Sequence, residues 1–363
     1  MKLQNIDLRL QKKLQNINTF VYARPSISAV SLRILILLMI QVVMLFLTKS
    51  YNSVILIGTT ALGGVAVASV NFLIYHEKPF QFLNIIIQGI FIGFLLPQSF
   101  PVVVAFFITF FTLMISRCIL FKSVNCWINI CCVAVMIAWF IGRKYFPDFM
   151  ITKDLISLKN SSVYMIQNGS FPIYSFDSTI TAFLNEKLFS IFKVTIPEGF
   201  VSLLWDTNSS IPAFRFNLLT IISSVIIFAD NAFSFIIPTL MLCVYAVLIR
   251  LFGPIFFGGS FNQGDIILAF LTSGTLFCSV FLIQWYGTVP IFLSGKIILG
   301  ILAGIIAFLV TGAGTSPIGM VYTVLITNFV NIFIRTFQEK NIPNNQSVTQ
   351  ESRNKSENQG NEL

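Results

Sequence analysis

The chain has 363 residues, of which 56% are hydrophobic and only 10% are charged, and its mean hydropathy is +0.84. So little charge over this length excludes a soluble globular domain and predicts an all-α polytopic membrane protein. The 23 basic residues outnumber the 14 acidic ones, but they gather at the ends of apolar runs and in the tails. That placement is typical of a chain in contact with membrane lipid and argues against a nucleic-acid partner.

Residues 1–33 form a basic lead in which Leu3, Ile6, Leu10 and Leu14 recur at three- and four-residue spacing. This pattern predicts an amphipathic helix on the cytoplasmic membrane surface, with an ordinary solvated helix as the alternative. The first apolar run begins only near Ile34, which argues against a signal peptide.

Ten apolar runs follow, and each is expected to cross the bilayer as a helix. Five fall within residues 34–142 and five within residues 213–336. Their approximate ranges are 34–48, 54–75, 82–96, 101–116, 125–142, 216–229, 232–249, 266–283, 291–311 and 316–334. Only Asp230-Asn231 separates the sixth run from the seventh, so Asp230 marks either a turn or, if it lies in lipid, a functional residue.

The segment 143–212 is the only long polar interruption, and long loops are usually functional. Among the short loops, Lys and Arg favour the side that carries both chain ends. Both termini are therefore predicted to be cytoplasmic, and 143–212 to face outward from a bacterial inner membrane. Residues 337–363 are polar and free of aromatic side chains after Phe337, which predicts a disordered cytoplasmic tail.

Small residues and cysteines punctuate the apolar runs. Gly300 and Gly304 form a GxxxG face, which indicates helix packing or, alternatively, a ligand crevice. The six cysteines, all in or beside apolar runs, are expected to be buried, inert thiols rather than metal ligands. Zinc is disfavoured because His76 is the only histidine.

The sequence carries no nucleophile elbow, phosphate-binding loop or metalloprotease motif. Its apolar runs hold almost no ionisable residues, so the chain is not expected to pump ions alone. Its 39 Phe, 9 Tyr and 4 Trp are mostly lipid-facing bulk, although they would also suit a flavin or a quinone.

Within 143–212, hydroxyl side chains crowd around one carboxylate in the stretch 175–185. Asp177 or Ser178 would cap a helix that continues through Leu184 towards Phe189. The alternative interpretation of this stretch comes only from a family resemblance.

Four stretches carry that resemblance. Gln88–Pro97 is similar to a Gly-Leu-Leu-Leu-Ala-Leu-x-Leu-Pro-Pro motif, and Asn129 with Phe146-Pro147 resembles the surroundings of an Asn-Pro-Ala motif. Asp177 and Ala182 match the ends of Asp-x-x-(Ser/Thr)-Gly-Ala in a flavinylation motif whose next residue is Thr. The last stretch resembles a Leu-Ser-Gly … Thr-Ser-Pro … Lys-Gly-Arg … Gly pattern through Thr272, Ser273, Gly274, Thr288, Pro290, Gly295, Lys296 and Gly300.

Over residues 80–330 the chain therefore resembles the D subunit of the Rnf complex, in the NqrB/RnfD family that the complex shares with the sodium-pumping NADH:quinone reductase. The resemblance implies a membrane translocase that passes electrons between reduced ferredoxin and NAD⁺ and moves Na⁺ or H⁺. It implies FMN bound covalently to a threonine on the outer side, and the other Rnf complex subunits (A, B, C, E and G) as partners.

The register of the flavinylation motif leaves alternatives open. Anchored on Asp177, the acceptor position falls on Phe183, which cannot form an ester. A two-residue shift instead makes Ser178-Thr179-Ile180-Thr181 the motif, with Thr181 as acceptor. The resemblance thus implies Thr181, Thr179, Asp177 and Ser178 as cofactor-binding candidates. Alternatively, the chain is a divergent subunit that binds FMN without a covalent link, or a scaffold subunit that binds none. The other interpretation is a solute or vitamin transporter.

Overall fold

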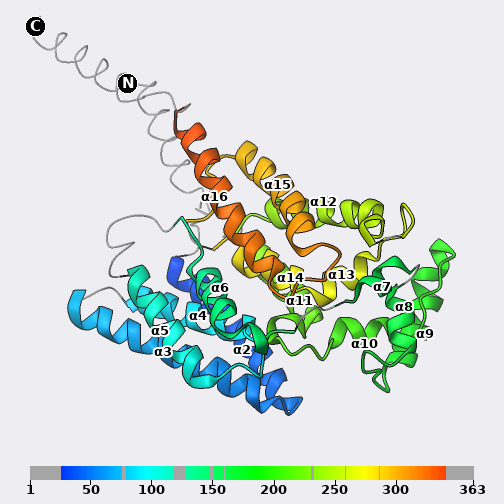
Figure 1. Ribbon diagram of the computed structural model, residues 1–363, viewed down its shortest axis with the longest axis horizontal. Coiled ribbons are helices and arrows are strands. Elements are labelled where there is room, and N and C mark those ends of the chain that lie inside the picture. The colour runs from blue at the N-terminus through cyan, green and yellow to red at the C-terminus, as the bar shows by residue number, and fades with distance from the viewer. Residues whose placement is uncertain are drawn as a thin grey trace, which may run out of the picture.

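The computed structural model describes residues 26–75, 79–117, 127–147, 151–158, 161–229, 233–257, 259–285 and 287–340. These residues form helices and loops without a strand, which confirms the predicted all-α class. Figure 1 shows α2–α6 gathered on one side of the molecule, α11–α16 on the other, and α7–α10 projecting beyond them. The expected helix before residue 26, most of the expected tail, His76, Cys118, Cys126 and Asp230 lie outside the described residues.

The long apolar helices fall into two groups, and each group covers five of the predicted spans. The first group is α2 (Ile27–Leu47), α3 (Tyr51–Tyr75), α4 (Pro79–Leu95), α5 (Val102–Ile115) and α6 (Ile130–Gly142). The second is α11 (Asn217–Ala229), α12 (Ile236–Phe252), a broken span of α13 (Ile266–Thr272), α14 (Thr275–Phe277) and the π-helix η6 (Cys278–Leu282), then α15 (Leu293–Thr311) and α16 (Gly319–Lys340).

The stretch 143–214 between these groups, called the outer segment after its predicted placement, is built from short helices. They are η2 (Arg143–Tyr145), α7 (Lys153–Ser157), α8 (Ser161–Gln167), α9 (Asp177–Lys187), η3 (Phe189–Phe192), α10 (Phe200–Trp205) and η4 (Pro212–Phe214). One further short helix, η5 (Ile255–Phe257), follows α12.

Length and composition single out four helices that can cross a membrane: Ile27–Leu47, Tyr51–Ile74, Leu293–Thr311 and Gly319–Lys340. Other apolar helices, such as Val102–Ile115 and Asn217–Ala229, are shorter. Two helices are longer than the sequence predicted. Helix α2 starts before Ile34 because the Ser26 side chain accepts a hydrogen bond from the Ala29 N–H at 3.3 Å. Helix α16 runs through Lys340, past the expected start of the tail.

Contacts between loops show which ends of the spans lie together. At one end, Gln98 N–H donates to the Ser210 carbonyl (2.8 Å), and Arg215 donates to the Ser50 hydroxyl. At the other end, Asn129 donates to the Leu282 carbonyl (2.9 Å). The outer segment therefore lies opposite the two ends of the described chain, as the alternating spans require. Which end faces the cytoplasm remains a prediction from the charge distribution.

The predicted continuous span 266–283 is wrong in one respect, because the helix breaks at Gly274. This residue has φ +70°, and a Cβ there would collide with the ring of Phe214. Only glycine meets both demands, so the chain turns and resumes as α14. The backbone freed by the break is supported by Asn217, which donates to the Leu271 carbonyl at 2.9 Å.

Close helix packing in both halves depends on glycine. On α4, a Cβ at Gly89 would lie 2.6 Å from the Thr60 carbonyl oxygen of α3. On α15, a Cβ at Gly304 would meet Val244 of α12 at 2.7 Å, and one at Gly300 would meet Leu240 at 2.9 Å. The helix-packing interpretation of the GxxxG face is therefore confirmed.

We expect Gly89→Ala to lower the thermal stability of the detergent-solubilised protein by about 1–3 kcal/mol, because the added methyl meets rigid backbone. Gly58→Ala is the matched control, since Gly58 lies on α3 with nothing within 4 Å of an added Cβ. Thermal unfolding of both variants measures the difference. Equal melting temperatures would contradict the close α3–α4 approach.

Candidate functional site

Asp177 is the centre of the outer segment. It is the first residue of α9, yet its fully buried carboxylate caps another helix, α10. Its oxygens accept hydrogen bonds from the Gly199 N–H (2.7 Å) and the Ser202 N–H (2.6 Å), and from the Thr181 hydroxyl (3.0 Å). The expected helix is present, but the carboxylate ties α9 to the start of α10 instead of capping its own first turn.

The ionised form of Asp177 is favoured by this geometry. Burial alone would raise the pKa of the carboxyl group, but the hydrogen bonds from Gly199, Ser202 and Thr181 outweigh it and hold the pKa below its ordinary value. The Asp177 carboxylate is therefore ionised at neutral pH.

The other predicted cofactor-binding residues do not converge on one surface. Thr181 is 3% exposed, and its hydroxyl is engaged with Asp177. Ser178 and Thr179 are exposed, and the Phe183 ring is 60% exposed. An ester on Thr181 would break its hydrogen bond and bring a phosphate next to the Asp177 carboxylate, so the folded outer segment does not fit that link.

Below Thr181 lies an apolar cavity of about 380 Å³ between the outer segment and the spans. Phe189 and Phe200 line it from the outer segment, and Ile221 of α11 and Phe270 of α13 line it from the membrane part. Three aromatic rings and one hydroxyl group suit a flat, largely apolar ring system better than a charged solute.

A second buried carboxylate anchors the outer segment to the spans. Asp206 is completely buried and accepts hydrogen bonds from Arg215 Nε at 2.8 Å and Arg215 Nη2 at 2.5 Å. The Tyr174 hydroxyl also donates to Asp206 (3.1 Å), while Arg215 reaches Ser50 in the loop between α2 and α3. Sequence reasoning missed this pair, because no spacing rule predicts contact between an Asp and an Arg nine residues apart in irregular chain.

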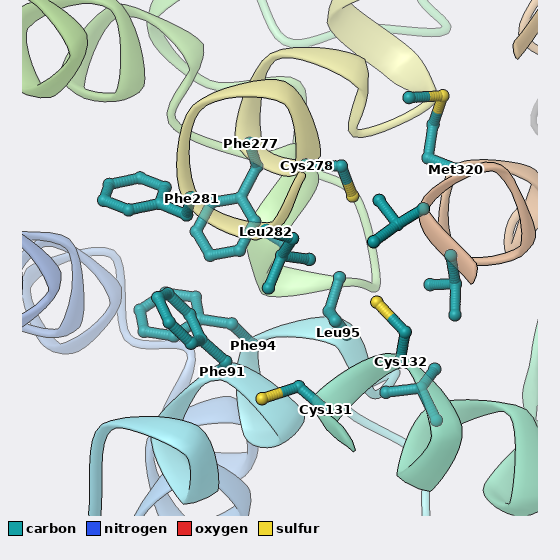
Figure 2. Close-up of a cluster of buried hydrophobic side chains, with 14 of the residues drawn as sticks. Phe91, Phe94, Leu95, Cys131, Cys132, Phe277, Cys278, Phe281, Leu282 and Met320 are labelled. Carbon is teal, nitrogen blue, oxygen red and sulfur yellow. The ribbon is translucent and has the colours of Figure 1, made fainter. Parts of the chain in front are cut away.

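The aromatic residues of α4 and of the broken span form the centre of the bundle (Figure 2). Phe91 lies 5.0 Å from Trp285 between ring centroids, and Phe94 stacks on Phe277 at 5.6 Å. Cys131, Cys132 and Cys278 are free and buried beside them, as predicted, whereas Cys243 is exposed. The described residues contain no cluster of His, Cys, Asp and Glu that could hold a metal ion.

These features define a polytopic, all-α membrane protein. On one side it carries a segment of short helices held together by two buried carboxylates, Asp177 and Asp206. The sequence matches the NQR2, RnfD, RnfE family over residues 15–343, and the chain belongs to that family. Members of this family are membrane subunits of ion-translocating complexes, which places the chain in a multisubunit membrane assembly. No curated protein matched the sequence.

Asp177→Asn should destabilise the outer segment by about 1–3 kcal/mol, because the amide nitrogen would face a backbone N–H donor and leave it unsatisfied. Asp154→Asn is the control, since Asp154 is exposed. Because folding lowers the pKa of Asp177, its stabilising contribution is complete above the unfolded-state pKa of about 3.9 and is lost as pH falls through the folded value. Limited proteolysis from pH 7 downward would measure both effects. Equal cleavage of the two variants would refute the proposed role of Asp177 in joining α9 to α10.

Asp206→Leu should cost about 3–5 kcal/mol, because it leaves the Arg215 charge buried without its partner. The double variant Asp206→Leu/Arg215→Met should recover most of this loss. Thermal unfolding of the two single variants and the double variant gives the coupling. An additive result would show that the two residues act independently.

Proposed function

We propose that this chain is the D-type membrane subunit of an Rnf-type complex, a translocase that transfers electrons between ferredoxin and NAD⁺ and moves Na⁺ or H⁺. Family membership over residues 15–343 supports this proposal most directly. The partners would be the other Rnf complex subunits, A, B, C, E and G. The length of the chain and the resemblance in motif order favour the Rnf subunit over its longer quinone-reductase relative.

We propose further that the outer segment holds FMN without a covalent link. The aligned acceptor is Phe183, and the Thr181 hydroxyl is occupied by Asp177, so neither position favours an ester. The cavity beneath Thr181 has the apolar and aromatic walls that an isoalloxazine ring would pack against. Bound there, FMN would supply one-electron chemistry.

The chain's own residues would contribute binding and orientation in this proposal. Phe189, Phe200 and Phe270 would pack against the ring, and the clasp of Asp177 would fix the distance between α9 and α10. These apolar walls would exclude water from the ring. A solute or vitamin transporter, the other class that the sequence left open, has no comparable support from the family.

The flavin proposal predicts about one FMN per chain in the natively purified complex, released by acid precipitation. The tryptic peptide from Asn160 to Lys187 should be unmodified in mass spectrometry. Leu204→Trp, which fills the cavity, should lose most of the flavin, whereas Thr179→Val should retain it.

A flavin adduct on Thr181 or Thr179 would keep the redox role but refute non-covalent binding. Thr181→Val separates these two acceptors, because it abolishes fluorescence of the denatured band only if Thr181 carries the ester. Absence of flavin from the intact complex would refute the flavin role and leave a scaffold subunit.

A further inference from the structure

Three buried carboxamide side chains, two on α16 and one just after η6, carry polar atoms without a hydrogen-bond partner. On α16, the exposed fractions of Asn328 and Asn331 are 0% and 1%, and both the oxygen and the nitrogen of each amide are unpartnered. Gln284, after η6, is 1% exposed, and its amide nitrogen is also unpartnered. A buried polar atom of this kind costs about 1–3 kcal/mol when nothing satisfies it, and five such atoms need a physical explanation.

The three side chains come from neighbouring elements. Asn328 and Asn331 are three residues apart, so they share one face of α16. Helix α16 packs against η6, and Arg335 donates to the Gly287 carbonyl at 2.9 Å. Gln284 lies two residues after η6, which places it in the same part of the bundle as α16.

The same region holds other ordered polar contacts. The Gln284 side-chain oxygen accepts a hydrogen bond from the Ser234 N–H at 2.9 Å, which fixes the amide and leaves its nitrogen as the free end. Asn129 donates to the Leu282 carbonyl at 2.9 Å and accepts from the Cys131 N–H at 3.0 Å. Asn129 is thus satisfied by the protein, whereas Asn328 and Asn331 are not.

The chemistry of the unpartnered atoms restricts what can bind them. Together they offer three amide nitrogens, each with two N–H donors, and two carbonyl acceptors, and none of the three side chains carries a charge. A metal cation is disfavoured, because the amide nitrogens repel it and the Arg335 guanidinium lies one turn away on the same helix. Water both donates and accepts, and it is the ligand that usually satisfies such groups in protein interiors.

We propose that Asn328, Asn331 and Gln284 form an internal site that binds a small cluster of water molecules in the half of the bundle nearer the chain ends. The site borders the aromatic centre, since Trp285 directly follows Gln284 and packs against Phe91. The proposal depends on the membrane placement of α16 and not on a flavin, so the two can fail separately.

Hydroxyl-radical footprinting of the detergent-solubilised full chain tests the site, because radicals formed from bound water modify adjacent side chains. Trp285 is only 2% exposed, so it reports on internal water. We expect several-fold less modification of Trp285 in the Asn328→Leu/Asn331→Leu variant than in the unaltered chain. We also expect a lower melting temperature, because the ordered water is lost.

The matched control is Thr327→Val on the same helix. Thr327 is buried, but its hydroxyl donates to the Thr323 carbonyl at 2.6 Å and needs no other ligand. This variant should leave the modification of Trp285 unchanged. Unchanged modification in the double Leu variant, or a melting temperature above that of the unaltered chain, would show a dry site and overturn the proposal.

The unaltered chain decides the question if the double variant does not fold. After rapid mixing with ¹⁸O-labelled water, bound water should pass the label to the Trp285 oxidation product more slowly than bulk water passes it to Trp205 in the outer segment. Equal rates, or no oxidation of Trp285, would overturn the proposal.

Discussion

The structure depends on one constraint, which is that backbone polar groups in a membrane must find partners inside the protein. Unbroken helices meet this requirement by themselves, and glycines such as Gly89 and Gly304 then allow the helix axes to approach closely. The constraint becomes demanding where a span is interrupted. Around the broken span of this chain, two asparagines donate hydrogen bonds to backbone carbonyl groups. Asn217 does so beside the break at Gly274, and Asn129 does so at the end of η6.

The outer segment is subject to a different constraint, because its short helices are not stable without tertiary contacts. Two buried carboxylates tie these helices together: Asp177 joins α9 to α10, and Asp206 joins the segment to Arg215 at the start of the second half. A carboxylate that accepts several N–H bonds is strongly bound and costly to remove. These two acids therefore hold the short helices to one another and to the second group of helices.

Hydropathy was sufficient to predict the all-α membrane class, because each span is a long apolar run. The break at Gly274 was not predictable from the run, since the reason for it is the ring of Phe214, which is distant in the sequence. Likewise, Asp177 was recognised as a capping residue, but the helix that it caps lies more than twenty residues further on. Local patterns predicted which residues were unusual, whereas tertiary contacts decided what those residues do.

The predicted cofactor-binding residues show the same limit of sequence patterns for single side chains. Anchored on Asp177, the motif puts the acceptor on Phe183, which cannot form an ester, and only a two-residue shift puts it on Thr181. Burial and hydrogen bonding disfavour the shifted register as well, because the Thr181 hydroxyl already donates to Asp177. Asp177, the residue that would match the aspartate of the motif, ties α9 to the start of α10. The aspartate thus has a structural role that does not require a flavin, so its presence alone is weak support for covalent attachment.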